Sequence, residues 1–306
     1  MRPPHAEPRI GLHLRGHARH PHPHRRSGRH RPGGVRLVTA PAPAAAAATL
    51  AGAPDVLICA GLDPSGGAGL IADVRIASLL GCRPAGVVTA LTVQNTTAVI
   101  DAEPVAAERV REQLEFLLSD IEVRAVKIGM IGSSEVAEAI ARALALTAAP
   151  VVWDPIVQPS RGAVRFAGAF EHALAALAPQ VTLLTPNAGE LAALTGMAVA
   201  SEADAALVGG ALAERLGIAV LVKGGHLAGD VAIDVLCLDG RVESLRGPRI
   251  AGGEHVHGTG CALASAIAAH LAHGADLVEA CRAAKDFVAA RIAAPVRPGR
   301  GGPAIV

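Results

Sequence analysis

Short apolar runs alternate with amphipathic segments from about Asp55 onward. The runs are nearly continuous and rich in β-branched residues, which is typical of strands buried on both faces of a parallel sheet. We expect these strands at residues 56–60, 85–91, 125–128, 151–153, 182–185 and 219–223.

The segments between these runs have helical periodicity. Helices are expected near residues 68–80, 105–119, 133–146, 168–177, 188–194 and 202–216, with two more at about 260–272 and 277–293. Runs at 231–237 and 242–244 flank Asp239-Gly240, a typical hairpin turn. The alternation predicts an α/β fold in three layers, with a mostly parallel central sheet and helices on both faces.

The first 53 residues differ from the rest of the chain. Arg, His, Pro and Gly dominate residues 1–36, and no periodicity is present. We expect a disordered Arg/His/Pro/Ala-rich extension at 1–53, followed by one folded domain at 54–306. The Ala-rich stretch at 37–53 resembles a signal or transit peptide, but Pro41 and Pro43 interrupt it. The alternative is that Met1 corresponds to a start codon upstream of the true one, so that this stretch is not part of the natural protein.

Composition excludes several classes of function. Aromatic residues make up 2% of the chain, which argues against base stacking with single-stranded nucleic acid. The net charge is +1 and the first 36 residues hold many of the cations, so the folded part lacks the basic balance of a nucleic-acid-binding domain. No apolar run approaches the roughly 20 residues of a membrane span. Five cysteines without paired spacing argue against disulfides or zinc and favour the cytoplasm.

The segment His257-Gly258-Thr259-Gly260-Cys261 runs directly into an expected helix. Unpaired backbone N–H groups and the helix dipole at such a start suit a phosphate or a developing oxyanion. Cys261 falls in the first turn, where a thiol pKa tends to decrease. The segment therefore indicates phosphoryl transfer to a hydroxyl group. The alternative is a flexible glycine loop followed by a buried structural cysteine.

Polar and glycine residues follow nearly every expected strand. Ligands of open parallel sheets bind at the carboxyl ends of the strands, so these loops predict one shared site. The loops are at residues 61–69, 92–96, 129–130, 154–155, 186–187 and 224–226.

Several motifs in these loops resemble the hydroxymethylpyrimidine/phosphomethylpyrimidine kinases of thiamine biosynthesis, which belong to the ribokinase-like superfamily. The resemblance covers about residues 55–295. Its most specific parts are AGLDPSGGAGLIAD at 60–73, TALTVQNT at 89–96, KIGM at 127–130, TPNAGE at 185–190, VKGGH at 222–226 and HGTGC at 257–261. The resemblance implies a ribokinase-like fold and the cofactors ATP and Mg²⁺.

The resemblance also implies a substrate site. Asp73 and Gln94 would recognise an aminopyrimidine, whose donor and acceptor atoms a carboxylate and a carboxamide can satisfy. Gly61 would let the backbone approach the ring closely, and Met130 would pack against it.

A second set of residues is implied for the nucleotide. Asp154 and Glu190 would organise Mg²⁺ and its waters, with Asn187 beside them to orient a water. Lys223 would neutralise triphosphate charge at a strand end.

The HGTGC motif would then supply the catalytic groups. Gly258, Thr259 and Gly260 would form the anion hole, with Thr259 also contacting the nucleotide. Cys261 would act on the substrate hydroxyl as a base or hydrogen-bond partner, and electrostatic stabilisation would supply most of the rate.

Two departures from the family bear on the lid and on the second phosphorylation. In the family, the loop that corresponds to residues 154–162 reads Asp-Pro-Val-Met-Val-Ala-Lys-Ser-Gly. The lysine is missing from this chain, although Arg161 offers a positive charge in the same loop. The family's Gly-Ile-Gln-Ala-Asp loses its glutamine at residues 69–73.

The expected activity is MgATP-dependent phosphorylation of 4-amino-5-hydroxymethyl-2-methylpyrimidine, and then of its monophosphate to the diphosphate. A pyridoxal or pyridoxine kinase of the same fold is the first alternative. A non-catalytic pyrimidine-binding sensor is the second, although a sensor need not keep Lys223, Asp154 and Glu190. The expected partner is the small-molecule substrate, without nucleic acid or membrane, and a homodimer is left open.

Overall fold

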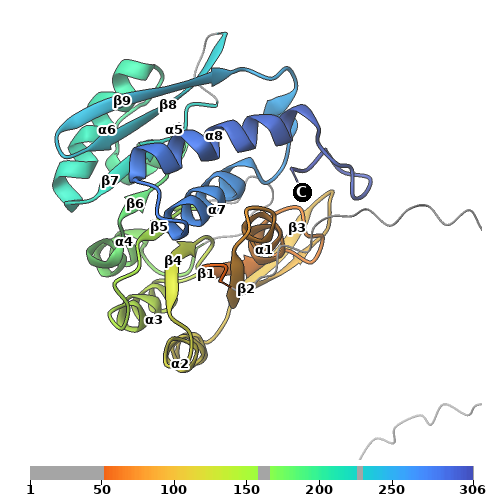
Figure 1. Cartoon of the computed structure of the whole chain (residues 1–306), viewed down its shortest axis with the longest axis vertical. Helices are drawn as coiled ribbons and strands as arrows, with labels where there is room; N and C mark the ends of the chain where they lie inside the picture. The colour runs from red at the N-terminus through yellow and green to blue at the C-terminus, as the bar shows by residue number, and fades with distance from the viewer. Residues whose placement is uncertain (1–51, 158–165, 226–229, 306) are drawn as a thin grey trace, which may run out of the picture. The chain divides into compact units, whose positions relative to one another are not determined.

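The computed structural model describes residues 52–157, 166–225 and 230–305. Within them, nine strands form one sheet in the order β3-β2-β1-β4-β5-β6-β7-β8-β9 (Figure 1). Neighbours from β2 to β7 are parallel, whereas β3 pairs antiparallel with β2, and β8 and β9 continue antiparallel from β7. The strands are β1 (Asp55–Leu62), β2 (Arg83–Gln94), β3 (Val99–Pro104), β4 (Val123–Ile128), β5 (Val151–Trp153), β6 (Leu183–Leu184), β7 (Ala219–Val222), β8 (Val231–Leu238) and β9 (Arg241–Pro248).

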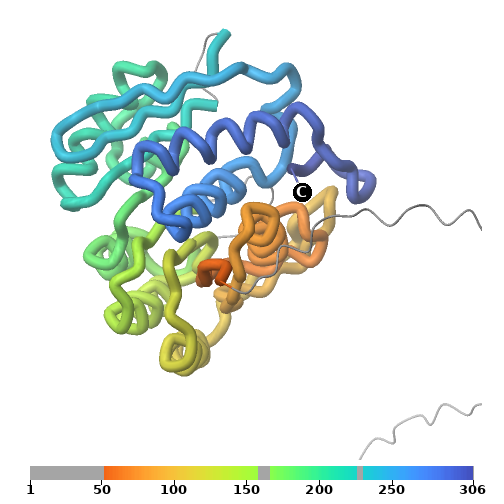
Figure 2. The backbone as a smooth tube through the Cα atoms, viewed as in Figure 1, coloured from red at the N-terminus to blue at the C-terminus, as the bar shows by residue number. Residues whose placement is uncertain are grey.

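Helices cover both faces of this sheet, as the sequence predicted. Helices α1 (Gly69–Leu79), α7 (Thr259–Ala272) and α8 (Leu277–Ala293) pack on one face (Figures 1 and 2). The opposite face carries α2 (Ala107–Leu118), α3 (Ser134–Leu144), α4 (Phe170–Leu177), α5 (Ala188–Thr195) and α6 (Glu202–Leu216). The expected extension at 1–53 lies, apart from its last two residues, outside the described residues, as do Arg161 and His226.

Strand β1 shows why the strands are apolar on both sides. Leu57 and Cys59 belong to the core beneath α2 and α3, whereas Val56 and Ile58 belong to the core beneath α1 and α7. All four side chains are at most 1% exposed. Successive side chains of a strand point to opposite faces, so a central strand covered on both sides needs an apolar residue at nearly every position.

The end of β2 corrects one expectation. Residues 92–96 were expected to form a loop, but β2 continues to Gln94 and pairs with β3, a strand that the sequence did not predict. Leu91 and Val93 are about half exposed in this hairpin, at 51% and 56%. Beyond the helix layers the strand lacks the continuous apolar run of a buried strand, and the polar residues Thr92, Gln94 and Asn95 were therefore read as a loop.

Beneath the carboxyl edge of the sheet lies a fully buried ion pair. The ammonium group of Lys127 on β4 pairs with the carboxylate of Asp73 on α1, and both side chains are 0% exposed. The hydroxyl of Ser265 on α7 donates to Asp73 Oδ1 at 2.9 Å. Burial opposes the charge of Lys127, but Asp73, Cys261 and Asp154 outweigh it and hold the pKa of Lys127 above its usual value. The pair thus ties α1 and α7 to the sheet.

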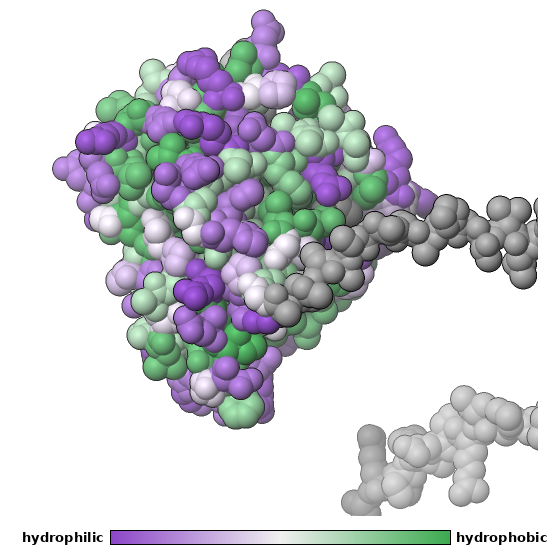
Figure 3. Space-filling view, viewed as in Figure 1, coloured by the Kyte–Doolittle hydropathy of each residue, from purple (hydrophilic) through white to green (hydrophobic). Residues whose placement is uncertain are grey.

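Among the described residues, none of the helices combines the length and the apolar composition of a membrane-spanning segment. On the face shown in Figure 3, polar and apolar side chains are interspersed.

Replacing Lys127 with Met should destabilise the fold by about 3–5 kcal/mol, because Asp73 would remain buried without its counter-ion. The double variant Lys127→Met/Asp73→Asn should recover part of this loss, since it removes both charges. Denaturant unfolding of the wild type, Lys127→Met and the double variant measures both effects. A loss below about 1 kcal/mol in Lys127→Met would show that the pair does not support the fold.

Candidate active site

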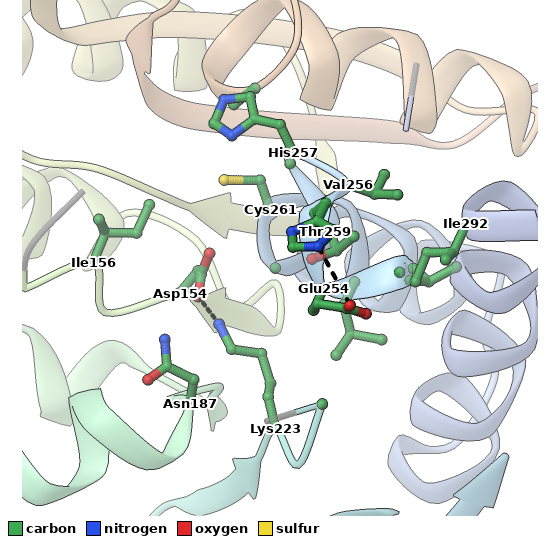
Figure 4. A pocket seen from close by; sticks show the side chains of 18 of the residues that line it. Asp154, Ile156, Asn187, Lys223, Glu254, Val256, His257, Thr259, Cys261 and Ile292 are labelled. Carbon is green, nitrogen blue, oxygen red and sulfur yellow. Dashed lines mark hydrogen bonds and ion pairs between the residues drawn. The ribbon is translucent and has the colours of Figure 1, made fainter. Parts of the chain in front are cut away.

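A cavity of about 830 Å³ opens at the carboxyl edge of the sheet. Residues from the predicted loops converge on it, together with the start of α7 (Figure 4). From the successive strand ends come Gly61, Gln94, Met130, Asp154, Asn187, Lys223 and Gly225. Segments that are up to about 200 residues apart in the sequence therefore form one site.

Lys223 is the centre of a compact charge cluster. Its Nζ lies 2.5 Å from Asp154 Oδ1 and 3.6 Å from Glu190 Oε2. The three side chains are at most 13% exposed. Burial opposes the charge of Lys223, but Asp154 and Glu190 outweigh it and raise the pKa of the lysine, which therefore stays cationic at neutral pH. The cluster combines one fixed positive charge with carboxylate oxygens facing the cavity.

The start of α5 positions Glu190. Asn187 Oδ1 accepts from the backbone N–H of Glu190 at 2.9 Å, and Glu190 Oε2 accepts from the backbone N–H of Asn187 at 2.7 Å. This capping box satisfies two backbone donors and fixes both side chains. In Figure 4 the amide nitrogen of Asn187 points toward the Asp154 side of the cavity.

Asp154 and Glu190 offer the oxygen donors that Mg²⁺ prefers. Within residues 52–157, 166–225 and 230–305, no group of three or more His, Cys, Asp and Glu side chains could hold a metal ion by itself. In kinases, Mg²⁺ usually keeps several waters and binds one or two carboxylates together with substrate phosphates. The two carboxylates therefore fit an ion that arrives with the nucleotide.

The anion loop, residues 257–261, leads into α7. Gly258 has a φ of +85°, and a Cβ there would lie 2.3 Å from the carbonyl oxygen of Gly67, so only glycine fits. The N–H of Ala262 makes the first intrahelical bond, to the carbonyl of Gly258 at 2.9 Å. The preceding N–H groups of Thr259, Gly260 and Cys261 thus lie at the positive end of the helix dipole.

Gly260 brings the backbone close to the charge cluster. A Cβ at this position would lie 3.1 Å from Lys223 Nζ and 3.7 Å from Asp154 Oδ2. The helix N-terminus and the lysine therefore face the same small volume, and both favour an anion there.

The Cys261 side chain lines the cavity, but its pKa differs from the expectation. Burial raises the pKa of the thiol to about 12, although Lys127 and the backbone of Gly69 act to lower it. The expectation of a lowered pKa is wrong because burial outweighs these two effects. At neutral pH Cys261 is a thiol and offers a weak donor near the anion loop.

The other end of the cavity holds the expected substrate residues. A Cβ on Gly61 would lie 3.3 Å from Met130 Sδ, so the absence of a side chain lets the methionine lie close to the backbone. Gln94 lines the wall from β2, and its Oε1 accepts from Thr92 Oγ1 at 3.4 Å. These residues present a flat apolar surface beside a carboxamide.

Asp73 is the expected substrate residue that the structure does not bring to the cavity. It is 0% exposed, and its carboxylate is bonded to Lys127 and Ser265, so direct contact with a substrate is ruled out in this arrangement. Lys127 lines the cavity instead. The position of Lys127 between Val126 and Ile128, in an apolar run, was the sequence signal that a buried carboxylate must pair with it. An unpaired buried ammonium group would be too costly.

A further set of lining residues had no signal in the sequence. Beyond the anion loop, apolar side chains line part of the wall beside the charged residues Arg249, Glu254 and Lys285, and Val256 and Ile292 are labelled in Figure 4. The members of this set that lie on α7 and α8 cannot be told from core positions by the periodicity of the sequence. The set comprises Ile250, Val256, Leu263, Val288, Ala289 and Ile292.

Comparison with known proteins places this geometry in a family. A hydroxymethylpyrimidine/phosphomethylpyrimidine kinase of Streptomyces coelicolor is 42% identical over 249 residues, which cover 81% of this chain and 92% of that protein. The enzyme of the same name from Rhizobium meliloti is 41% identical over 251 residues, covering 80% of this chain and 94% of that protein.

Solved structures confirm the ribokinase-like fold. The ADP complex of Bacillus subtilis pyridoxal kinase has a TM-score of 0.72 at 31% identity, covering 82% of this chain and 96% of that one. The phosphomethylpyrimidine kinase of Clostridium difficile has a TM-score of 0.67 at 32% identity, covering 78% and 99%. Residues 63–305 match the sequence model of the phosphomethylpyrimidine kinase family, and the chain belongs to that family.

Proposed function

We propose that this protein uses ATP to phosphorylate 4-amino-5-hydroxymethyl-2-methylpyrimidine, and then its monophosphate to the diphosphate, in thiamine diphosphate biosynthesis. The observation that carries the proposal is the convergence of the anion loop, Lys223 and Cys261 between two differently built ends of one cavity. A phosphoryl donor and a flat polar acceptor can meet there with the transferring group at the anion loop.

The end formed by Gly61, Gln94 and Met130 suits the pyrimidine. A carboxamide offers one acceptor and one donor side by side, and an aminopyrimidine offers the complementary pair in its amino group and adjacent ring nitrogen. Met130 would cover one face of the ring. Pyridoxine lacks this adjacent pair, so Gln94 favours the aminopyrimidine over the alternative substrate.

The apolar end suits the nucleotide base. Val256, Leu263 and Ile292 can enclose a flat purine without requiring any charge. Nearby, Asp234 Oδ1 accepts from the backbone N–H of Gly224 at 2.8 Å, and Lys285 Nζ donates to Asp234 Oδ2 at 2.7 Å. These bonds hold Gly224 beside Lys223, where the triphosphate would run toward the anion loop.

In the proposed reaction the hydroxyl oxygen of the substrate attacks the γ-phosphorus of ATP. The new O–P bond forms as the bond to the β,γ-bridging oxygen breaks, and ADP leaves with that electron pair. Lys223 and the N–H groups of residues 259–261 stabilise the charge on the transferred group. Mg²⁺, held by Asp154 and Glu190, would neutralise phosphate charge when it binds with the nucleotide.

In the proposed reaction Cys261 accepts the hydroxyl proton. A thiol with a pKa of about 12 is rarely ionised at neutral pH. Phosphoryl transfer has a loose transition state that needs little early deprotonation. Cys261 therefore orients the hydroxyl, and its small thiolate fraction accepts the proton late in the transfer.

The surroundings of the enzyme are part of the proposal. All five cysteines lie in described residues and are free thiols, which suits a reducing cytoplasm. Leu91, Val93 and Ile100 are exposed on the β2–β3 hairpin, which forms an edge of the sheet. A homodimer through this hairpin would cover them.

The direct test is ATP consumption by the wild-type protein with and without the pyrimidine alcohol, with mass spectrometry of the products. The proposal requires consumption that depends on the pyrimidine, with the monophosphate and then the diphosphate appearing. A sensor would bind the pyrimidine without consuming ATP.

Gln94→Ala should raise KM for the pyrimidine alcohol about fivefold to tenfold and leave KM for ATP within about twofold. Each lost hydrogen bond typically costs about 0.5–1.5 kcal/mol, and the ATP end is distant. Gln113→Ala, in an exposed position on α2, is the matched control. Equal changes in both KM values would count against a substrate-side role for Gln94.

Cys261→Ala should keep the fold and lower kcat by about 10²-fold, the usual scale for losing an acid–base group. Cys261→Ser should recover little, whereas Cys261→Asp should retain partial activity. Because the raised pKa leaves the thiolate scarce, wild-type kcat should increase with pH between about 6.5 and 9. Cys261→Asp should lose that increase, since its carboxylate is already ionised.

The measurements are kcat at saturating MgATP and pyrimidine across this pH range, with melting curves alongside. Near wild-type turnover in Cys261→Ala would mean that the thiol is only a packed core group.

A further inference from the structure

The tail segment, residues 296–305, pairs with His257, the first residue of the anion loop. The N–H of His257 donates to the carbonyl of Pro303 at 2.8 Å, and the N–H of Ile305 donates to the carbonyl of His257 at 3.1 Å. Ala304 exchanges two further backbone bonds with Val296, at 2.8 and 2.9 Å. Ala304 and Ile305 are each 2% exposed. The tail segment is therefore a built part of the domain, attached to the base of the anion loop.

The same segment lies against the turn between β2 and β3. The N–H of Gly301 donates to Thr96 Oγ1 at 3.2 Å. A Cβ on Gly301 would lie 1.6 Å from the carbonyl oxygen of Thr96, and one on Gly299 would lie 2.4 Å from Thr96 Oγ1. Both glycines are required for this close approach. The turn follows Gln94, so the tail also touches the hairpin that carries the substrate contact.

The glycine loop after β1 completes this arrangement. A Cβ on Gly67 would lie 3.3 Å from His257 Cδ2 and 3.6 Å from Ala304 Cβ. A Cβ on Gly258 would lie 3.5 Å from Ile305 Cγ2 as well as 2.3 Å from Gly67. Three segments distant in sequence are thus packed at the foot of the anion loop, and Gly302 lines the cavity itself.

We infer that the tail segment is a positioning element of the phosphoryl-transfer site, which fixes the anion loop relative to the substrate hairpin. The inference rests on the proposed function. The anion loop contains two glycines and no side-chain cap on α7, so its own sequence restrains it weakly. The backbone bonds of His257 to the tail supply that restraint, and the contact with Thr96 sets its position against the hairpin.

Small displacements matter at such a site. Transfer requires the acceptor oxygen, the phosphorus and the stabilising N–H groups to be aligned, and a shift of about 1 Å can cost about 10²-fold in rate. A purely structural tail would instead contribute only to the stability of the domain. Loss of a positioning role would lower kcat and leave the melting temperature nearly unchanged, whereas loss of a structural role would lower the melting temperature and leave kcat nearly unchanged.

The test is Gly301→Ala in the full chain, which forces the tail away from the Thr96 carbonyl. Gly210→Ala on α6 is the matched control, because a Cβ there meets nothing within 4 Å. We expect Gly301→Ala to lower kcat at least tenfold, with KM for ATP within about threefold and a melting temperature close to the control. If Gly301→Ala does not fold, Thr96→Val is the alternative variant. It removes only the hydroxyl that accepts from Gly301, and it should also lower kcat.

Hydrogen exchange provides a readout that does not depend on activity. In Gly301→Ala the amides of His257 and Ile305, whose hydrogen bonds join the anion loop to the tail segment, should exchange at least tenfold faster than in the wild type, while those of β4 stay protected. Unchanged exchange at His257 and Ile305, or a lowered melting temperature with wild-type kcat, would overturn the inference. Absence of phosphoryl transfer in the wild type would instead refute the proposed function, and the exchange result would still decide the role of the tail.

Discussion

The pairing of buried charges at the carboxyl edge of the sheet is the constraint on which this structure depends. Lys223 with Asp154 and Glu190, and Lys127 with Asp73, hold two ammonium groups where water is largely excluded. A buried charge without a partner would cost several kcal/mol. The elements that carry these residues must therefore meet at fixed positions. The same requirement that stabilises the fold assembles the site.

The two lysines have different consequences for chemistry. Lys223 faces the cavity beside Gly260. The backbone of Gly260 comes so close that a Cβ there would lie 3.1 Å from Lys223 Nζ. In the proposed function the lysine stabilises a phosphate. Lys127 is bound to Asp73 and acts on the pKa of Cys261 through its charge. A bound anion at the helix start would raise the pKa of Cys261 further and leave even less thiolate, so the electrostatic groups carry most of the proposed catalysis.

Much of this arrangement follows from the sequence, because periodicity and loop chemistry are local. The order of strands and helices, the convergence of the loops, and the placement of Asp154, Glu190 and Lys223 were all predicted. Asp73 on α1 was misplaced because one sequence cannot show which carboxylate pairs with the buried lysine on β4. Strand β3 was missed because its sequence, VIDAEP, lacks the continuous apolar run that marks the buried strands. The role of the tail depends on contacts between Gly301 and Thr96, which are 205 residues apart.

The central claim is that the cavity selects an aminopyrimidine alcohol over a pyridoxine-type alcohol of similar size. The most direct measurement is kcat/KM of the wild-type enzyme for the two alcohols side by side, at the same saturating MgATP. A site that hydrogen-bonds its substrate rejects analogues lacking the matching groups, because its own polar atoms are left unpaired. The account predicts at least a tenfold preference for the aminopyrimidine. Equal values, or a higher value for pyridoxine, would contradict it.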